Sequence, residues 1–257
     1  MNQNELVAIV FVSVLFCGML LCFEIGRRLG ARTATEEVGR AGLGVVEGAI
    51  FALLGLLVAF TFSGAAARFE GRRHLIVEEA NDIGTAYLRI DLLPVDAQPE
   101  IRDLFRNYVD SRLATYQHLY DKALTSSLYV KSQELQNEIW SKSVAAARRS
   151  DNTAATMLLM PALNSMIDIT TVRTSASEDH PPFIIFSMLA VIALASSMMA
   201  GFEMAGTSRR SWLHIVGFSL ILSISVYVIL DLEFPRLGLI RVDAFDHYLV
   251  DVRSSMK

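Results

Sequence analysis

The sequence predicts an all-α membrane protein with four transmembrane helices and an α-helical bundle inserted between the second and the third. Four apolar runs are long enough to cross a bilayer. The polar segment between the second and third runs carries apolar residues at a spacing of three and four, without strand-like alternation. The composition agrees, because 53% of the residues are hydrophobic and 19% are charged, which is fewer charges than a soluble domain usually carries.

The first two runs are Leu6–Phe23 and Ala41–Ala67. No lysine or arginine precedes the first run, and no small-x-small cleavage site follows it, so we expect a retained span and not a signal peptide. The third run is Phe183–Phe202 and the fourth is Trp212–Leu232. Tryptophan at the start of the fourth run suits an anchor at the membrane interface.

The polar insert is predicted to be helical throughout. Residues 68–93 continue the second span without a breaker as far as Pro94, and Pro99 suits the first turn of the next helix. A further helix runs to Arg149, and a last one contains Pro161. The predicted division of the chain is spans one and two in 1–67, the insert in 68–180, spans three and four in 181–234, and a C-terminal tail in 235–257.

The side of the membrane that the insert faces stays open. Four arginines fill the first loop, and Arg209 and Arg210 fill the third, which favours these loops in the cytoplasm. Arginines 68, 72 and 73 directly follow the second span and favour the opposite orientation. The sequence therefore predicts a multi-pass membrane protein without an orientation.

The second span carries a stripe of small residues on one helix face. Its members are Gly44, Gly48, Ala52, Gly55, Ala59 and Ser63. Small residues let helices approach closely in lipid, where hydrophobic force between helices is weak. The stripe predicts either tight packing within one subunit or packing beside other copies around a shared axis.

Leu56 and Phe60 lie next to this stripe, four residues apart. Apolar side chains at a constriction can gate a pore by excluding water. The alternative is that both face lipid or a neighbouring helix, as such residues commonly do in membrane proteins.

The fourth span has a polar ridge, which consists of Ser219, Ser223, Tyr227 and Asp231. In a helix of this length such a ridge should face protein or water. Asp231 and Glu233 are close enough to the helix end to reach the interface. Glu47 is interpreted first as a helix-end carboxylate and second as an ion contact.

No catalytic, cofactor or metal site is predicted, and an enzyme is not expected. The sequence has no phosphate-binding glycine loop, nucleophile elbow or zinc-protease spacing. His74 and Glu78 are four apart, which favours a surface charge pair over a metal site. The net charge of -4 gives no signature of nucleic-acid binding.

The end of the second span, "AFTFSGAAARFEGRRHLIVEEAN", resembles the exit of the second membrane helix in bestrophin-type channels. There an apolar helix ends in an aromatic residue, passes a short segment of small residues and reaches an Arg-aromatic-Glu-x-Arg patch. The corresponding residues here are Phe60, the segment Thr61–Ala67, and then Arg68, Phe69, Glu70 and Arg72. The whole chain, including "EEANDIGTAYLRIDLLP" and "YVILDLEFPRLGLIRVD", resembles the bacterial four-span bestrophin-like family, which has no assigned activity.

The resemblance implies a homo-oligomeric ion channel, pentameric in bestrophins, whose second helix lines the pore. By position, the apolar neck would fall on Phe60, Leu56 and Ala52. Three departures matter: Ala52 is small where the neck residue is normally bulky, the arginine patch is one residue shorter, and the acidic calcium-binding run of animal bestrophins is absent. We therefore expect no calcium gating.

The expected partners are the lipid bilayer, further copies of the chain and inorganic ions, with no nucleic acid. The charges do not decide between anions and cations. The rival hypothesis is a non-conducting membrane scaffold or sensor whose helical insert binds a partner. A transporter has little support, because there are no inverted repeats or broken helices.

Overall fold

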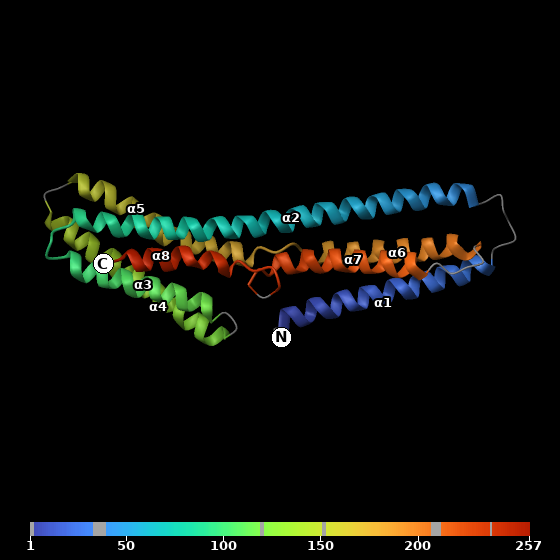
Figure 1. Ribbon diagram of the computed structural model, residues 1–257. Helices are drawn as coiled ribbons and strands as arrows, with labels where there is room; N and C mark the ends of the chain where they lie inside the picture. Colours follow the sequence, from blue (N-terminus) through green and yellow to red (C-terminus); the bar gives the residue numbers. More distant parts are fainter. Residues whose placement is uncertain (1–2, 33–39, 119–120, 151–152, 207–211, 237) are drawn as a thin grey trace. The chain divides into compact units, whose positions relative to one another are not determined.

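The computed structural model describes residues 3–32, 40–118, 121–150, 153–206, 212–236 and 238–257. Within these ranges all regular secondary structure is helical (Figure 1). Four helical segments are long and apolar enough to cross a membrane: Leu6–Arg32, Gly44–Leu92, Thr153–Glu203 and Trp212–Glu233. The predicted all-α class and the four apolar helices are thus confirmed. The third loop, with Arg209 and Arg210, lies outside the described residues.

The chain forms two compact units, and each is built from separate stretches of sequence. The first unit contains Met1–Phe69 and His180–Arg241. The second contains Glu70–Asp179 and Val242–Lys257. The second unit therefore includes most of residues 235–257, which the sequence predicts to be a C-terminal tail.

Helix α1 (Gln3–Arg32) is the centre of packing in the first unit. It lies along α6 (Phe183–Glu203) and α7 (Trp212–Glu233), as Figure 1 shows. The core of this unit is apolar and includes Leu15, Met19, Leu54, Leu189, Ala193, Leu222 and Val226.

Two glycines let α1 and α6 touch backbone to backbone. A Cβ atom added at Gly26 would lie 1.8 Å from the carbonyl oxygen of Met198, and one added at Gly201 would lie 2.2 Å from that of Phe23. No side chain fits at either distance. Close packing of helices at small residues, which is common in membranes, is therefore a feature of α1 and α6 in this subunit.

Helix α2 (Arg40–Leu88) is continuous. The expectation that no break separates the apolar second span from the charged sequence after it is confirmed. A 3₁₀ turn, η2 (Arg89–Leu92), follows α2, and the regular helix therefore ends shortly before Pro94. The segment has no proline and no cluster of turn residues at the exit, which explains why nothing interrupts the ladder of hydrogen bonds.

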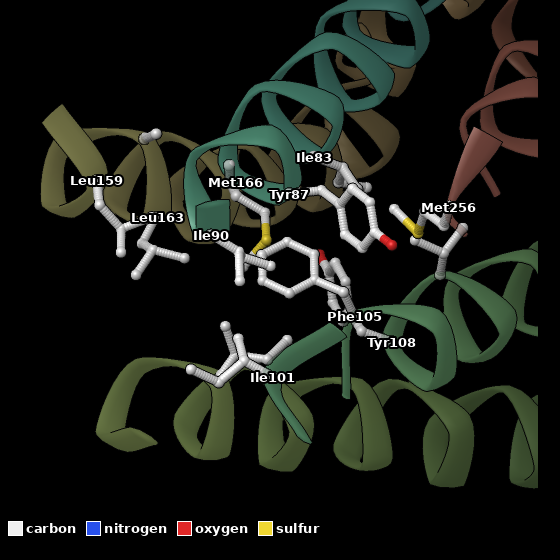
Figure 2. Packing of buried hydrophobic residues seen from close by; sticks show 14 of the residues in the cluster. Ile83, Tyr87, Ile90, Ile101, Phe105, Tyr108, Leu159, Leu163, Met166 and Met256 are labelled. Carbon is white, nitrogen blue, oxygen red and sulfur yellow. The ribbon is translucent and has the colours of Figure 1, made fainter. Parts of the chain in front are cut away.

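The second unit packs the end of α2 against three further helices: α3 (Gln98–Gln117), α4 (Lys122–Arg149) and α5 (Thr153–Glu178). Pro99 stands in the first turn of α3, as expected. Figure 2 shows the core side chains that these helices share, among them Ile83, Tyr87, Ile90, Ile101, Phe105, Tyr108, Leu159, Leu163 and Met166. Burial raises the pKa of the Tyr108 phenol, whose oxygen accepts a hydrogen bond from Gln136 at 3.1 Å.

A C-terminal helix completes this core. In α8 (His247–Ser255), Leu249 is fully buried, and Met256 just after it packs into the same cluster. The guanidinium of Arg253 donates to both carboxylate oxygens of Asp110, at 2.7 Å and 3.0 Å. Residues 242–257 are thus part of the packed core of the second unit.

Candidate pore helix and its exit

In the first unit, α2 presents an exposed stripe on one face. Its members follow one another at a spacing of three or four and are all exposed: Ala52, Leu56, Phe60, Ser63 and Ala67. Leu56 is 51% exposed and Phe60 is 65% exposed. The predicted neck residues therefore share one face of α2, which is exposed among the described residues of the subunit.

The opposite face of α2 packs within the subunit. Leu54 and Ala65 are buried in apolar clusters formed with α6 and α7. Glu47 is also buried, and its carboxyl group lies within hydrogen-bonding reach of Glu203 on α6. One side of α2 therefore packs against its own subunit, and the opposite side is exposed.

The predicted small-residue stripe divides between these sides. A Cβ added at Gly44 would meet Glu203 at 3.0 Å, whereas a Cβ at Gly48 or Gly55 would meet nothing within 4 Å beyond the helix itself. Ala59 and Ser63 are exposed. Within the described residues, therefore, neither Gly48 nor Gly55 packs tightly against another helix of its own subunit.

The other helices of the first unit expose bulky apolar side chains. Examples are Val14 on α1, Val191 on α6 and Ile221 on α7, which are 65%, 64% and 69% exposed. Large aliphatic side chains are usual on surfaces that face lipid, whereas small residues are enriched where helices meet helices. The open face of α2 combines such bulky residues, Leu56 and Phe60, with the exposed small residues Ala52, Gly55 and Ala59.

At the exit of α2, Arg68 pairs with a buried carboxylate. Its Nε donates to the two carboxylate oxygens of Glu233, at 3.0 Å and 3.1 Å, and its Nη2 also pairs with this group. The Glu233 side chain is only 2% exposed. His180 Nδ1 lies 3.6 Å from the same carboxylate, and the His180 ring packs on Phe234. Arg68 thus compensates the charge of the buried Glu233 carboxylate, and His180 lies beside the same group.

The other residues of the exit motif have separate partners. Phe69 packs in an apolar cluster with Ala65 in the first unit. In the second unit, Arg72 donates to the carbonyl oxygens of Ala176 at 2.9 Å and Asp179 at 2.8 Å, at the end of α5. Carbonyl groups at a helix C-terminus lack intrahelical donors, so a guanidinium is a favourable partner there.

Arg73 completes the set of basic residues. It pairs with Glu70 at 2.5 Å, and its guanidinium lies 4.1 Å from the centroid of the Phe245 ring. His74 Nε2 also approaches Glu70, at 3.3 Å. His74 thus contacts the carboxylate of Glu70, one turn before it, whereas the sequence suggested a pair with Glu78.

The polar ridge of α7 faces its own subunit. Ser219, Ser223 and Asp231 are buried, and Tyr227 is half-buried. The hydroxyls of the two serines have no hydrogen-bond partner within the part of the chain that the structure describes.

Asp231 has a defined structural role. Its carboxylate accepts hydrogen bonds from the backbone N–H groups of Leu239 at 2.9 Å and Ile240 at 2.7 Å. The chain approaches so closely that a Cβ at Gly238 would lie 1.8 Å from Asp231 Oδ1. Glycine at 238 therefore permits the loop after α7 to fold over this carboxylate.

A buried charge cluster lies in the second unit. Glu79 on α2 accepts a hydrogen bond from Arg112 Nε at 2.7 Å and also pairs with Arg173 of α5. Glu79 is fully buried and Arg112 is 2% exposed. The Tyr116 ring lies under both guanidiniums, at 5.1 Å from Arg112 and 4.2 Å from Arg173. The cluster links three helices and contains more arginines than carboxylates.

Sequence reasoning expected Glu233 to reach the interface, whereas its side chain is buried against Arg68. It missed His180 and the contacts of Gly26 and Gly201. For the glycine contacts a partial signal was present, because Gly201 lies in the third apolar run and Gly26 follows the first run by three residues. For the buried carboxylate no local signal existed, since its partner Arg68 is far away in the sequence. Within the described residues, no group of three or more potential metal ligands occurs.

In a comparison with protein families, the chain matches the Bestrophin-like domain over residues 9–244. Among curated proteins and solved structures, none matches this chain. The family match covers both the four apolar helices and the helical segments between them. The chain therefore belongs to the bestrophin-like family.

Proposed function

We propose that the protein is a homo-oligomeric ion channel of a bacterial inner membrane, in which α2 of each copy lines a shared pore. The observation that carries the proposal is the open stripe from Ala52 to Ala67 on a helix whose other side packs within the subunit. Membership of the bestrophin-like family supports it, since the family name relates the chain to channels. Five copies are expected from the same relationship.

Small residues beside the stripe support contact between copies. Gly48 and Gly55 have open space next to them, and both lie on the flank of the stripe, where a neighbouring α2 would approach. In lipid, such small positions favour helix association through close van der Waals contact. The stripe itself then faces the axis, and its flank faces the next subunit.

Leu56 and Phe60 form the narrow apolar part of this pore. Rings of apolar side chains exclude water when a pore is narrow enough, which blocks ions until the ring widens. Phe60 is the more exposed of the two and stands closer to the exit. Ala52, one turn further in, leaves the passage wider there.

The test is current through planar bilayers that contain purified protein, with native mass measurement of the particle. We expect discrete currents, and Phe60→Ala should increase the open probability or conductance several-fold, because the apolar barrier becomes wider. The matched control is Val191→Ala, which removes a similarly exposed side chain from α6 and should leave the current unchanged.

Two outcomes contradict the proposal. If the protein is a monomer in gentle detergent, its copies share no axis and cannot line a common pore. If the current does not exceed that of an empty bilayer, the result favours the non-conducting scaffold or sensor. Equal effects of Phe60→Ala and Val191→Ala would place the neck elsewhere.

A further inference from the structure

The two flanks of the open stripe on α2 differ in the size of their side chains. In a helix that turns about 100° per residue, Leu53 and Ala59 lie about 60° to either side of Leu56. Both residues are exposed within the part of the chain that the structure describes. The stripe therefore has one flank that contains Leu53 and another that contains Ala59.

The flank with Leu53 carries large apolar side chains at a spacing of seven residues. Val46, Leu53 and Phe60 are 52%, 47% and 65% exposed, and we call these three residues the bulky seam. Phe60 stands where this flank borders the stripe. A repeat of seven residues keeps side chains in contact with a partner when two helices coil around each other. The bulky seam is therefore spaced as one helix that pairs with another.

The flank with Ala59 carries small residues. A Cβ atom added at Gly48 or Gly55 would meet nothing within 4 Å beyond the helix itself, and these two glycines are also seven residues apart. Ala59 is exposed as well. We call Gly48, Gly55 and Ala59 the small seam. Because these positions lack large side chains, another helix can approach them closely.

Each residue of the bulky seam lies at nearly the same height along α2 as one residue of the small seam. The pairs are Val46 with Gly48, Leu53 with Gly55, and Phe60 with Ala59. At a rise of about 1.5 Å per residue, the two members of a pair differ in height by about 3 Å or less. Copies around a rotation axis stand at equal heights. A large side chain of one copy can therefore meet a small residue of the next.

We propose that the bulky seam of one copy packs against the small seam of the next copy, all the way around the oligomer. The inference rests on the proposed function, because the shared axis brings opposite flanks of neighbouring α2 helices together. In a ring, each copy uses two different surfaces, one for each neighbour. Helix α2 has two such surfaces, of opposite size and with matched heights, so the partner that fits each of them is a second α2.

The test is disulfide cross-linking of the full-length protein in lipid vesicles, in a background with Cys17→Ala and Cys22→Ala. Leu53→Cys and Gly55→Cys are introduced into the same chain. Oxidation should give a series of covalent oligomers, because each copy is linked to both of its neighbours. Two cysteines bond when their Cα atoms lie within about 7 Å, so this series reports direct contact between the two seams.

The matched control has the same number of cysteines on one flank. Val46→Cys with Leu53→Cys places both on the bulky seam, and oxidation should leave these chains separate in a denaturing gel. A second control mixes chains that carry Leu53→Cys alone with chains that carry Gly55→Cys alone. Its products should stop at dimers, because each chain then has a single cysteine to share.

A second measurement uses the size of the side chains and needs no cysteine. Gly55→Leu fills the small seam and should lower the share of oligomer in native mass spectrometry. Adding Leu53→Ala removes the side chain that faces it in the next copy and should raise this share several-fold. Val14→Ala, which shortens a side chain that is 65% exposed on α1, should not restore the oligomer.

The outcomes separate this inference from the proposed function. An oligomer of unchanged mass that gives no covalent series with Leu53→Cys and Gly55→Cys overturns the contact between the seams and leaves the proposed function intact. Equal cross-linking of the control with Val46→Cys and Leu53→Cys also overturns it, because two bulky seams would then face each other. A protein that is monomeric before oxidation overturns the proposed function and this inference with it.

Discussion

Arg68 and Glu233 form an ion pair in which a nearly buried carboxylate at the end of α7 accepts two hydrogen bonds from Nε alone, at 3.0 Å and 3.1 Å. The side chain of Arg68 is 28% exposed, whereas the side chain of Glu233 is 2% exposed. Loss of the arginine therefore costs more than loss of an ordinary surface pair, because an ionised group would remain buried without its main partner.

Arg68→Met is expected to destabilise the folded protein by about 3 kcal/mol. The double variant Arg68→Met, Glu233→Leu should recover part of this loss, because it removes the uncompensated carboxylate as well. Thermal unfolding followed by circular dichroism in detergent measures both. A double variant that is no more stable than Arg68→Met would contradict this explanation.

Glycines in α1 and α6 should respond differently from a glycine in α2 to the same substitution. Gly26→Ala and Gly201→Ala force a methyl group against a backbone carbonyl, and each should cost about 1–3 kcal/mol through overpacking. Gly55→Ala meets no neighbour within the subunit and should leave the melting temperature unchanged or slightly raised.

The flank of the stripe supplies a separate prediction about assembly. Gly48→Leu and Gly55→Leu should reduce the oligomer to smaller species without loss of helical signal, because the added side chain occupies the space where a neighbouring helix approaches. Native mass spectrometry gives the distribution of species. Oligomers of unchanged mass with both substitutions would show that this flank faces lipid.

The buried cluster around Glu79 should be sensitive to its carboxylate. Glu79→Ala leaves two guanidiniums in the core of the second unit without their shared partner, and the expected loss is about 3–5 kcal/mol. Asp110→Ala removes the exposed partner of Arg253 and should cost less than about 1 kcal/mol. Chemical unfolding of both variants in one detergent tests the contrast.

Asp231 should hold the loop after α7 through its two backbone hydrogen bonds. Asp231→Asn replaces one acceptor by a donor and should open the loop, at a cost of about 1–3 kcal/mol. Trypsin should then cleave faster after Arg236 and Arg241, while cleavage at other sites is unchanged. Equal cleavage in wild type and variant would assign the loop conformation to other contacts.

Sequence reasoning succeeded where the cause of structure is local. Hydropathy and helix signals predicted the four apolar helices, the unbroken passage of α2 through its exit and the first turn of α3 at Pro99. These features depend on neighbouring residues along the chain, so the pattern of side chains is sufficient to predict them.

Long-range pairing was not predictable in the same way. The partners of Glu79 are Arg112 and Arg173, which lie on other helices, 33 and 94 residues away in the sequence. Likewise the stripe of small residues drew attention to α2, whereas the closest backbone contact involves Gly26 and Gly201. Helical periodicity identifies a face, and only tertiary structure identifies what lies against it.

The contact between Gly26 and Met198 also constrains the order of assembly during biosynthesis. At ribosomal rates, the roughly 170 residues between the two positions take about 10–30 s to translate. During that interval α1 sits in the bilayer with an uncovered glycine face, and lipid or the insertion machinery must occupy it. The first unit can close only when α6 arrives, and errors in its assembly should therefore be sought late in translation.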